Sequence, residues 1–237
     1  MSTTPDHHVR MAVNAQVWAA LTFLHWPVDP EAIQCRLPPG LRVQTHSGSA
    51  WISLTPFVMK DVRVPPLPPV PGWSTFPEVN LRTYVRHEHG SEGLWFLALW
   101  STRRAFNVAL RGLGLPYQGV RAWVRAVEPG VLAYRARPAP GAAPLRLSAT
   151  VRAGDRIAAP SDVETWLTGR WNAYFERAGR LWRVPVSHEP WPLRRALVSS
   201  LHTDVFTVMG LPVPAVEPLA HATPGVSTRL GIPRLAH

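Results

Sequence analysis

The chain has 237 residues, 46% of them hydrophobic and 17% charged, a composition typical of a globular protein with a substantial core. A single cysteine, Cys35, excludes an internal disulfide, and the apolar runs are shorter than the roughly 20 residues of a membrane-spanning helix. The N-terminus lacks the basic-then-apolar order of a secretory signal. We therefore expect a cytoplasmic protein with one domain over residues 1–237, frayed at 1–12.

The formal net charge of +10 raises the question of a nucleic-acid partner. Arginines are scattered along the chain, with Arg103-Arg104 and Arg194-Arg195 as the only adjacent pairs, and Lys60 is the only lysine. Such scatter is more typical of codon usage in a GC-rich genome than of a polyanion-binding surface. We expect no nucleic-acid partner and no membrane partner, and keep nucleic-acid binding as a third hypothesis.

The first third of the chain predicts a strand, a helix and a hairpin. Residues 13–25 form a strand candidate rich in aromatic and β-branched residues. Asp29 as N-cap and Pro30 at the first helical position then predict a short helix that stops at Pro38-Pro39-Gly40. Residues 41–46 and 50–59 flank a Ser-Gly-Ser turn, which predicts a hairpin.

The middle of the chain predicts a second hairpin and a helix. A proline-rich segment at 64–72 indicates an extended surface loop, since proline fixes φ. Residues 76–87 and 94–101 follow as a hairpin. The apolar residues at 103–113 are spaced as in a helix that buries one side and stops at 112–114; they are Phe106, Val108, Ala109, Leu110 and Leu113.

The last part of the chain predicts more short strands. Candidates lie at 119–127, 131–137 and 145–152, followed by a short helix capped by Ser161 or Asp162 and a hairpin turning at Ala178-Gly179. A short helix is expected near 203–209. Many short strands with few helices indicate a mainly β fold, an antiparallel barrel or a sandwich.

The strand at 76–85 carries the chemistry that stands out. Side chains alternate between the two faces of a strand, so Glu78, Asn80, Arg82 and Tyr84 share one face, and Val79, Leu81, Thr83 and Val85 share the other. The first face is either a solvated surface or the lining of a polar pocket. Periodicity alone leaves both alternatives open.

Common cofactor motifs are missing from the sequence. It has no Gly-x-Gly-x-x-Gly, no phosphate-binding loop and no cysteine pair. His87 and His89 could share a metal with Glu88 or Glu92, but no third ligand follows at a fixed spacing, so we expect solvated turn residues. We predict no cofactor and no metal.

Four motifs carry a resemblance to a known family: FLHWPVDPEAIQCRLPPGLRV, WISLTPFVMKDVR, FPEVNLRTYVR and HEPWPL. With the order of the intervening strands, they resemble the uncharacterised YqjF-like family of the acetoacetate decarboxylase-like superfamily. The likeness runs from about residue 18 to about residue 214. It implies a closed, largely antiparallel β-barrel around a small cavity, with a few short peripheral helices.

The resemblance carries over only in part to the active site. The decarboxylases of that superfamily use a lysine that follows Gly-x-Pro, and here Gly114-Leu-Pro is followed by Tyr117. Lys60 lies at the end of a strand beside Asp61, where a solvated lysine is the default. Glu78 resembles the acid on the cavity strand. The resemblance therefore disfavours Schiff-base decarboxylation.

If the polar face of the 76–85 strand points into a barrel, its apolar alternates pack beneath an outer helix. Glu78 is then the candidate acid/base, Asn80, Arg82 and Tyr84 are candidate ligand-binding residues, and Tyr117 and His188 are weaker candidates. A buried Tyr or His that is satisfied by backbone groups is an equal alternative for those two.

Two functional hypotheses follow besides nucleic-acid binding. The first is a small-molecule-binding barrel whose ligand is a carboxylate or keto acid. If it is an enzyme, it would be a lyase or hydrolase-like acid/base catalyst. The second is a non-catalytic assembly or sensor module that inherited the fold. Either form is expected to be a homo-oligomer, a dimer or larger.

Overall fold

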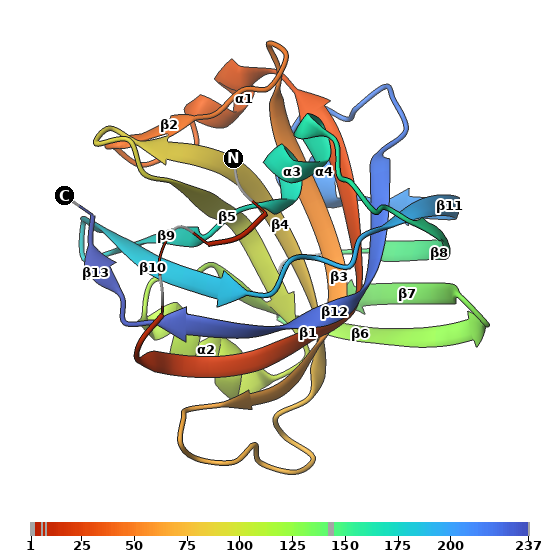
Figure 1. The fold of residues 1–237 in the computed structure, drawn as a ribbon, viewed down its shortest axis with the longest axis horizontal. Coiled ribbons are helices and arrows are strands. Elements are labelled where there is room, and N and C mark those ends of the chain that lie inside the picture. Colours follow the sequence, from red (N-terminus) through yellow and green to blue (C-terminus); the bar gives the residue numbers. More distant parts are fainter. Residues whose placement is uncertain (1–2, 6, 8, 142–144, 237) are drawn as a thin grey trace.

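The protein is described here by a computed structural model that covers residues 3–5, 7, 9–141 and 145–236, and its fold is mainly β (Figure 1). The strands are β1 (Ala12–Val28), β2 (Leu41–Val43), β3 (Ala50–Arg63), β4 (Phe76–His87), β5 (Glu92–Ser101), β6 (Tyr117–Glu128), β7 (Val131–Pro138), β8 (Leu147–Arg156), β9 (Asn172–Arg177), β10 (Arg180–His188), β11 (Arg194–Thr203), β12 (Leu219–Gly231) and β13 (Arg234–Leu235). The helices are α1 (Pro30–Gln34), α2 (Arg104–Gly112), α3 (Asp162–Thr168) and α4 (Val205–Val208). The expected frayed segment 1–12 falls partly outside the described residues.

Two helices begin where their capping residues predict. The Asp29 side chain accepts the backbone N–H of Glu31 at the start of α1, and Pro30 occupies the first turn. In α3 the Ser161 hydroxyl accepts the N–H of Glu164, while the Glu164 carboxylate accepts the N–H of Ser161. This reciprocal capping box holds Glu164 in a defined position.

The strands belong to one hydrogen-bonded sheet that forks at β5 and at β12. One edge of β5 pairs with β6 at its C-terminal end and with β9 near its N-terminal end, in parallel in both cases. One edge of β12 pairs with β11 at 221–222 and with β10 at 228–230. Two rings of paired strands therefore share five strands, β12, β1, β3, β4 and β5, called the shared wall below.

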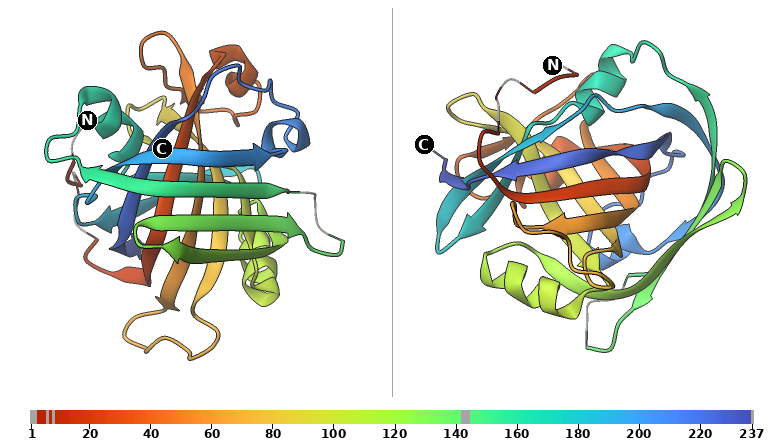
Figure 2. Two further views of the ribbon diagram at one scale, coloured as in Figure 1. Left: turned by 90° about the vertical axis from the view of Figure 1, so that its right-hand side faces the viewer. Right: turned by 60° about the horizontal axis from the view of Figure 1, so that its bottom comes forward.

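The larger ring runs from the shared wall through β6, β7, β8 and β11 and back to β12, and the smaller ring runs through β9 and β10. Figure 2 shows β6, β7, β8 and β11 running across the strands of the shared wall. The main apolar core fills the larger ring, with Leu54, Leu81, Trp100 and Tyr134 among its buried members. Helices α1 and α4 contribute Ile33 and Phe206 to the same core.

Three sequence expectations differ from the structure. Val79 and Leu81 pack inside the larger ring rather than beneath an outer helix. The segment after α1 does not form a hairpin with β3, because β2 pairs with β4, and only an isolated His46–Ser49 bridge closes the turn. Helix α2 buries Asn107, whereas Val108 is 54% exposed. In the first two cases a contact between distant segments overrode the local pattern, and in α2 the hydrogen bonds of Asn107 to Ser101 and Gln118 did so.

Among the described residues, no helix is long and apolar enough to cross a membrane.

Candidate functional site

Strand register gathers polar side chains on the face of the shared wall that lies inside the smaller ring. His25 of β1 lies opposite Ser53 of β3, which lies opposite Arg82 of β4. Thr55 lies opposite Asn80 in the same way. Directly opposed residues of paired strands share a face, so these side chains line one surface.

The polar residues of β4 are mostly withdrawn from water. Glu78 is 1% exposed, Arg82 is 6% exposed and Tyr84 is fully buried, whereas Asn80 is partly exposed. The solvated-face alternative therefore does not apply to Glu78, Arg82 and Tyr84. Buried ionisable groups of this kind are costly unless they are paired, and they concentrate at functional sites.

The Glu78 carboxyl group accepts hydrogen bonds from two of the predicted site residues. The Tyr117 hydroxyl lies 3.2 Å from both carboxyl oxygens, and the Asn80 amide, oriented by its partners, donates to Oε1 at 2.8 Å. Burial raises the pKa of Glu78 to about 8, and the two hydrogen bonds oppose that rise. Glu78 is therefore mostly protonated at neutral pH and can exchange a proton near it.

Arg82 is a buried cation that pairs with no carboxylate among the described residues. Among the described residues no carboxylate oxygen lies within 4.0 Å of its nitrogens, and its Nε has no hydrogen-bond acceptor. Its guanidinium lies over the Phe23 ring, 5.0 Å from the ring centroid, and interacts electrostatically with Tyr84. Burial lowers the pKa of Arg82, but a guanidinium remains charged at neutral pH.

Tyr84 joins Arg82 to two residues that the sequence did not single out. Its hydroxyl lies 3.2 Å from Nδ1 of the fully buried His25. Arg170 lies over its ring at 4.9 Å and forms an ion pair with Glu92 at 3.4 Å. Burial raises the pKa of Tyr84, while Arg82 and Arg170 partly counteract it.

His188 lies in an aromatic group rather than in contact with Glu78. Its ring is 4.5 Å from Trp171 and 4.6 Å from Trp191, and its Nδ1 lies 2.6 Å from the Glu189 carbonyl. Burial, with a further contribution from Arg82, lowers the pKa of His188 to about 4, so its ring is neutral at pH 7. Its ring and hydrogen-bond contacts are thus with Trp171, Trp191 and Glu189 rather than with the other predicted site residues.

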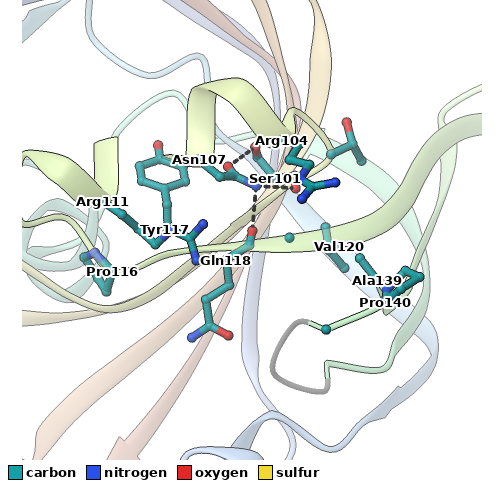
Figure 3. Close-up of a pocket in the computed structure, with 13 residues that line it drawn as sticks. Ser101, Arg104, Asn107, Arg111, Pro116, Tyr117, Gln118, Val120, Ala139 and Pro140 are labelled. Carbon is teal, nitrogen blue, oxygen red and sulfur yellow. Dashed lines mark hydrogen bonds between the residues drawn. The ribbon is translucent and has the colours of Figure 1, made fainter. Parts of the chain in front are cut away.

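An open pocket of about 650 Å³ lies beside α2, and Tyr117 is one of its lining residues (Figure 3). Asn107 holds α2 in place there, because its amide nitrogen donates to the Ser101 and Gln118 carbonyls at 3.0 and 2.9 Å. Tyr117 thus connects this pocket with the buried Glu78 carboxyl.

Lys60 lies at the exposed end of β3, outside this set of buried groups. Since it is the only lysine, the polar interior offers no side-chain amine for a Schiff base.

His87, Glu88 and His89 offer ligand atoms that all lie within 4.8 Å of one another, close enough to share a cation. However, the His89 backbone N–H approaches Nδ1 of His87 at 3.3 Å, and Glu88 and His89 are exposed. Glu92, the fourth predicted group, pairs with Arg86 and Arg170 instead. The prediction that these are turn residues without a metal stays a prediction.

Sequence reasoning missed His25, Ser53, Arg170 and His221 as parts of the polar interior. One signal could have found His25. It shares a strand face with Phe23, opposite Leu24 and Trp26, and an isolated polar residue in an apolar strand must find a partner. Arg170 follows α3 and carried no such signal.

The fold is similar to that of acetoacetate decarboxylase-like proteins. Acetoacetate decarboxylase from Legionella pneumophila superimposes with a TM-score of 0.63 at 15% identity, over 100% of this chain and 90% of that one. The enduracididine biosynthesis enzyme MppR complexed with pyruvate gives 0.66 at 15% identity, over 97% and 93%.

The family follows from the sequence match. Residues 15–227 match DUF2071, a family of uncharacterized conserved proteins, and the chain belongs to it. The uncharacterized protein YqjF of Bacillus subtilis (strain 168) is 29% identical over 218 residues, which are 87% of this chain and 85% of that protein.

Proposed function

We propose that the protein binds a small carboxylate or keto acid between the shared wall and the elements that complete the smaller ring, without forming a lysine Schiff base. In this proposal the paired strands make a closed barrel within a single domain, and the ligand lies in its interior. The observation that carries the proposal is the buried Arg82, which has no carboxylate within 4.0 Å among the described residues. A ligand carboxylate would supply the missing anion through two parallel hydrogen bonds.

The surrounding residues suit such a ligand. Asn80 is partly exposed and bonded to Glu78, so it lies where a ligand could reach both side chains. Tyr84 supplies a hydroxyl beside Arg82, and Tyr117 orients Glu78. If the protein is an enzyme, Glu78 is its acid/base group, because its pKa of about 8 lies near neutral pH. His188 would border the ligand from the aromatic side.

The likeness to MppR supports the ligand class. MppR has been solved with pyruvate, a keto acid, and it shares the fold of this chain. At 15% identity this likeness speaks only for the fold, so the ligand assignment rests on Arg82 and its neighbours.

Calorimetric titration of the full chain with pyruvate, acetoacetate and lactate tests the proposal. We expect binding of at least one of these acids by the native protein, weakened roughly tenfold to a hundredfold in Arg82→Ala, because a charge-assisted hydrogen bond contributes about 1.5 to 3 kcal/mol. Arg86→Ala is the matched control, since Arg86 lies on the same strand with its side chain 57% exposed. Equal affinity of native protein and Arg82→Ala, or no binding of any acid, would refute the proposal.

Borohydride trapping tests the mechanism separately. With pyruvate and borohydride, we expect the mass of the chain to stay unchanged, because its only lysine is exposed and lies outside the buried polar groups that would hold the ligand. A stable adduct on Lys60 would contradict the exclusion of Schiff-base chemistry and leave the binding result intact.

A second function rests on exposed apolar side chains. Val64, Leu67 and Val70 of the proline-rich loop are 59%, 64% and 57% exposed, and Trp73 of the same loop contacts Phe106 of α2. A non-catalytic assembly module would use such a surface to form the expected homo-oligomer. Light scattering decides between oligomer and monomer: a monomer at high concentration would remove the support for this alternative.

A further inference from the structure

Two buried histidines lie next to the proposed ligand site without a role in it. His25 of β1 is fully buried, and His221 of β12 is 2% exposed. His221 is the register partner of Phe23, so both imidazoles lie on the face of the shared wall that carries Arg82. Their ring centroids are 5.8 Å apart.

Each imidazole has one nitrogen engaged and one that meets no partner in the described part of the chain. Nδ1 of His25 lies 3.2 Å from the Tyr84 hydroxyl, and Nε2 of His221 lies 3.1 Å from the Glu164 carboxylate. Nε2 of His25 and Nδ1 of His221 are buried and have no hydrogen-bond partner among the residues that the structure describes. Burial lowers the pKa of both histidines, so both rings are neutral and each carries one proton.

The partner of His221 fixes the position of its ring proton, and the direction of the relay sets that of His25. A carboxylate only accepts, so the proton of His221 is on Nε2 and its Nδ1 is an acceptor. If the Tyr84 phenol donates to Nδ1 of His25, the orientation that a relay toward Glu164 requires, that nitrogen is an acceptor. The proton of His25 is then on Nε2. In this arrangement Nε2 of His25 is a donor and Nδ1 of His221 is an acceptor, so one water could accept from the first and donate to the second.

We propose that Tyr84, His25, His221 and Glu164 form one proton relay, completed by a single water between the two imidazoles, that leads from the Arg82 site to the surface helix α3. A buried water makes two to four hydrogen bonds, and these two nitrogens would supply two of them. The Glu164 carboxylate at the outer end has a side chain 13% exposed, and the capping box of α3 fixes its position.

The relay lets Tyr84 act as a base for a bound ligand, which is the part that rests on the proposed function. The phenol oxygen takes a proton from the ligand while its own proton passes to Nδ1 of His25. The Nε2 proton of His25 passes to the water, a water proton passes to Nδ1 of His221, and the Nε2 proton of His221 passes to Glu164. The ligand gains the negative charge beside Arg82, Glu164 becomes neutral, and both imidazoles stay neutral in their other tautomer.

The charged groups around the relay are compatible with this direction. Arg82 and Arg170 face Tyr84 and favour negative charge there, and Arg82 also disfavours a charged His25. Arg195 of β11 disfavours a charged His221, while Glu164 favours it.

Imidazole nitrogen-15 spectra of the full chain test the relay without any ligand, so a failed ligand titration would not affect the result. At pH 7 we expect both His25 and His221 as neutral Nε2–H tautomers. In Glu164→Gln the side chain can donate as well as accept, so the tautomers of both rings should become mixed, including that of His25, which does not touch Glu164.

Controls separate a relay from a local effect. Glu128→Gln removes a carboxylate that pairs with Arg152 on the surface, and it should leave both rings unchanged. In the double variant His221→Phe/Glu164→Gln, the tautomer of His25 should be the same as in His221→Phe alone. A His25 Nδ1–H tautomer in the native protein, or a Glu164→Gln effect confined to His221, would overturn the proposal. The native and Glu164→Gln spectra decide this even if His221→Phe does not fold.

Discussion

Glu78 and Arg82 are two strand steps apart on one face of β4, and burial affects them in different ways. The carboxyl responds by holding a proton, whereas the guanidinium cannot lose its charge at neutral pH and is left without an anion among the described residues. A protein that only needed stability would do better with an apolar residue at position 82. A retained cation of this kind is what the proposed carboxylate ligand would explain.

Glu78 should make the stability of the fold depend on pH. Burial raises its pKa from 4.5 to about 8, so the folded chain keeps a proton that the unfolded chain releases. The stability contributed by the protonated form is complete below pH 4.5 and is lost as pH rises through about 8. In Glu78→Gln the side chain is neutral at every pH. The difference in unfolding free energy, variant minus native, should therefore rise by roughly 1 kcal/mol for each pH unit between pH 5 and 8.

Denaturant titrations of both proteins across this range provide the measurement. Histidines with lowered pKa values, such as His188, contribute stability that is lost as pH falls below about 6.5, but they are present in both proteins and cancel in the difference. Glu176→Gln, on an exposed position of β9, is the control and should run parallel to the native protein. A pH-independent difference for Glu78→Gln would mean that Glu78 is ionised in the folded state.

At the scale of elements, α2 shows how a polar residue can position a helix. Its N-cap residue Arg103 makes no capping hydrogen bond through its side chain, and apolar Val108 is exposed. Asn107 instead docks the helix through Ser101 and Gln118, the residue next to Tyr117. The docking of α2 is thus linked to the position of Tyr117, which hydrogen-bonds Glu78.

Removing this anchor should weaken the fold. Asn107→Ala leaves the Ser101 hydroxyl and two carbonyl groups without their partner, which should cost about 2 to 3 kcal/mol of unfolding free energy in denaturant titration. Val108→Ala, on the next residue of the helix, should change stability by less than about 0.5 kcal/mol because the side chain is exposed. Equal effects of the two substitutions would show that Asn107 does not anchor α2.

The local signals of the short helices and strands could be read from the sequence. The caps at Asp29 and Ser161 act within four residues, so the sequence predicted where α1 and α3 begin. The pairing of β2 with β4 could not be predicted, because residues 41–46 carry the same alternation whether the partner is β3 or β4.

At the scale of the whole molecule, the smaller ring depends on a close approach of β5 and β9. A Cβ at Gly93 would lie 2.8 Å from the Asn172 carbonyl oxygen and 2.8 Å from the Tyr174 ring. Only glycine leaves room for the parallel pairing of Leu94 with Ala173 that follows.

Gly93→Ala should therefore loosen the smaller ring selectively. We expect a loss of roughly 1 to 3 kcal/mol from overpacking, and hydrogen exchange should show faster amide exchange in β9 and β10 than in the native protein, with β7 and β8 unchanged. Gly112→Ala, where a Cβ would meet nothing within 4 Å, should be neutral or slightly stabilising. Uniformly faster exchange in Gly93→Ala would argue that the two rings unfold as one unit.

The sequence by itself determined that the chain is mainly β, where its capped helices begin, and that one face of the 76–85 strand is polar. These features depend on neighbours within a few residues. Only the tertiary structure decided which interior each face lines, because β4 is buried on both sides and its alternation is the same whether Glu78 faces a core or water. It also brought His25 to Tyr84 across 59 residues and joined β10 to β12. Contacts between distant strands are selected by burial in the whole fold, and no local pattern records them.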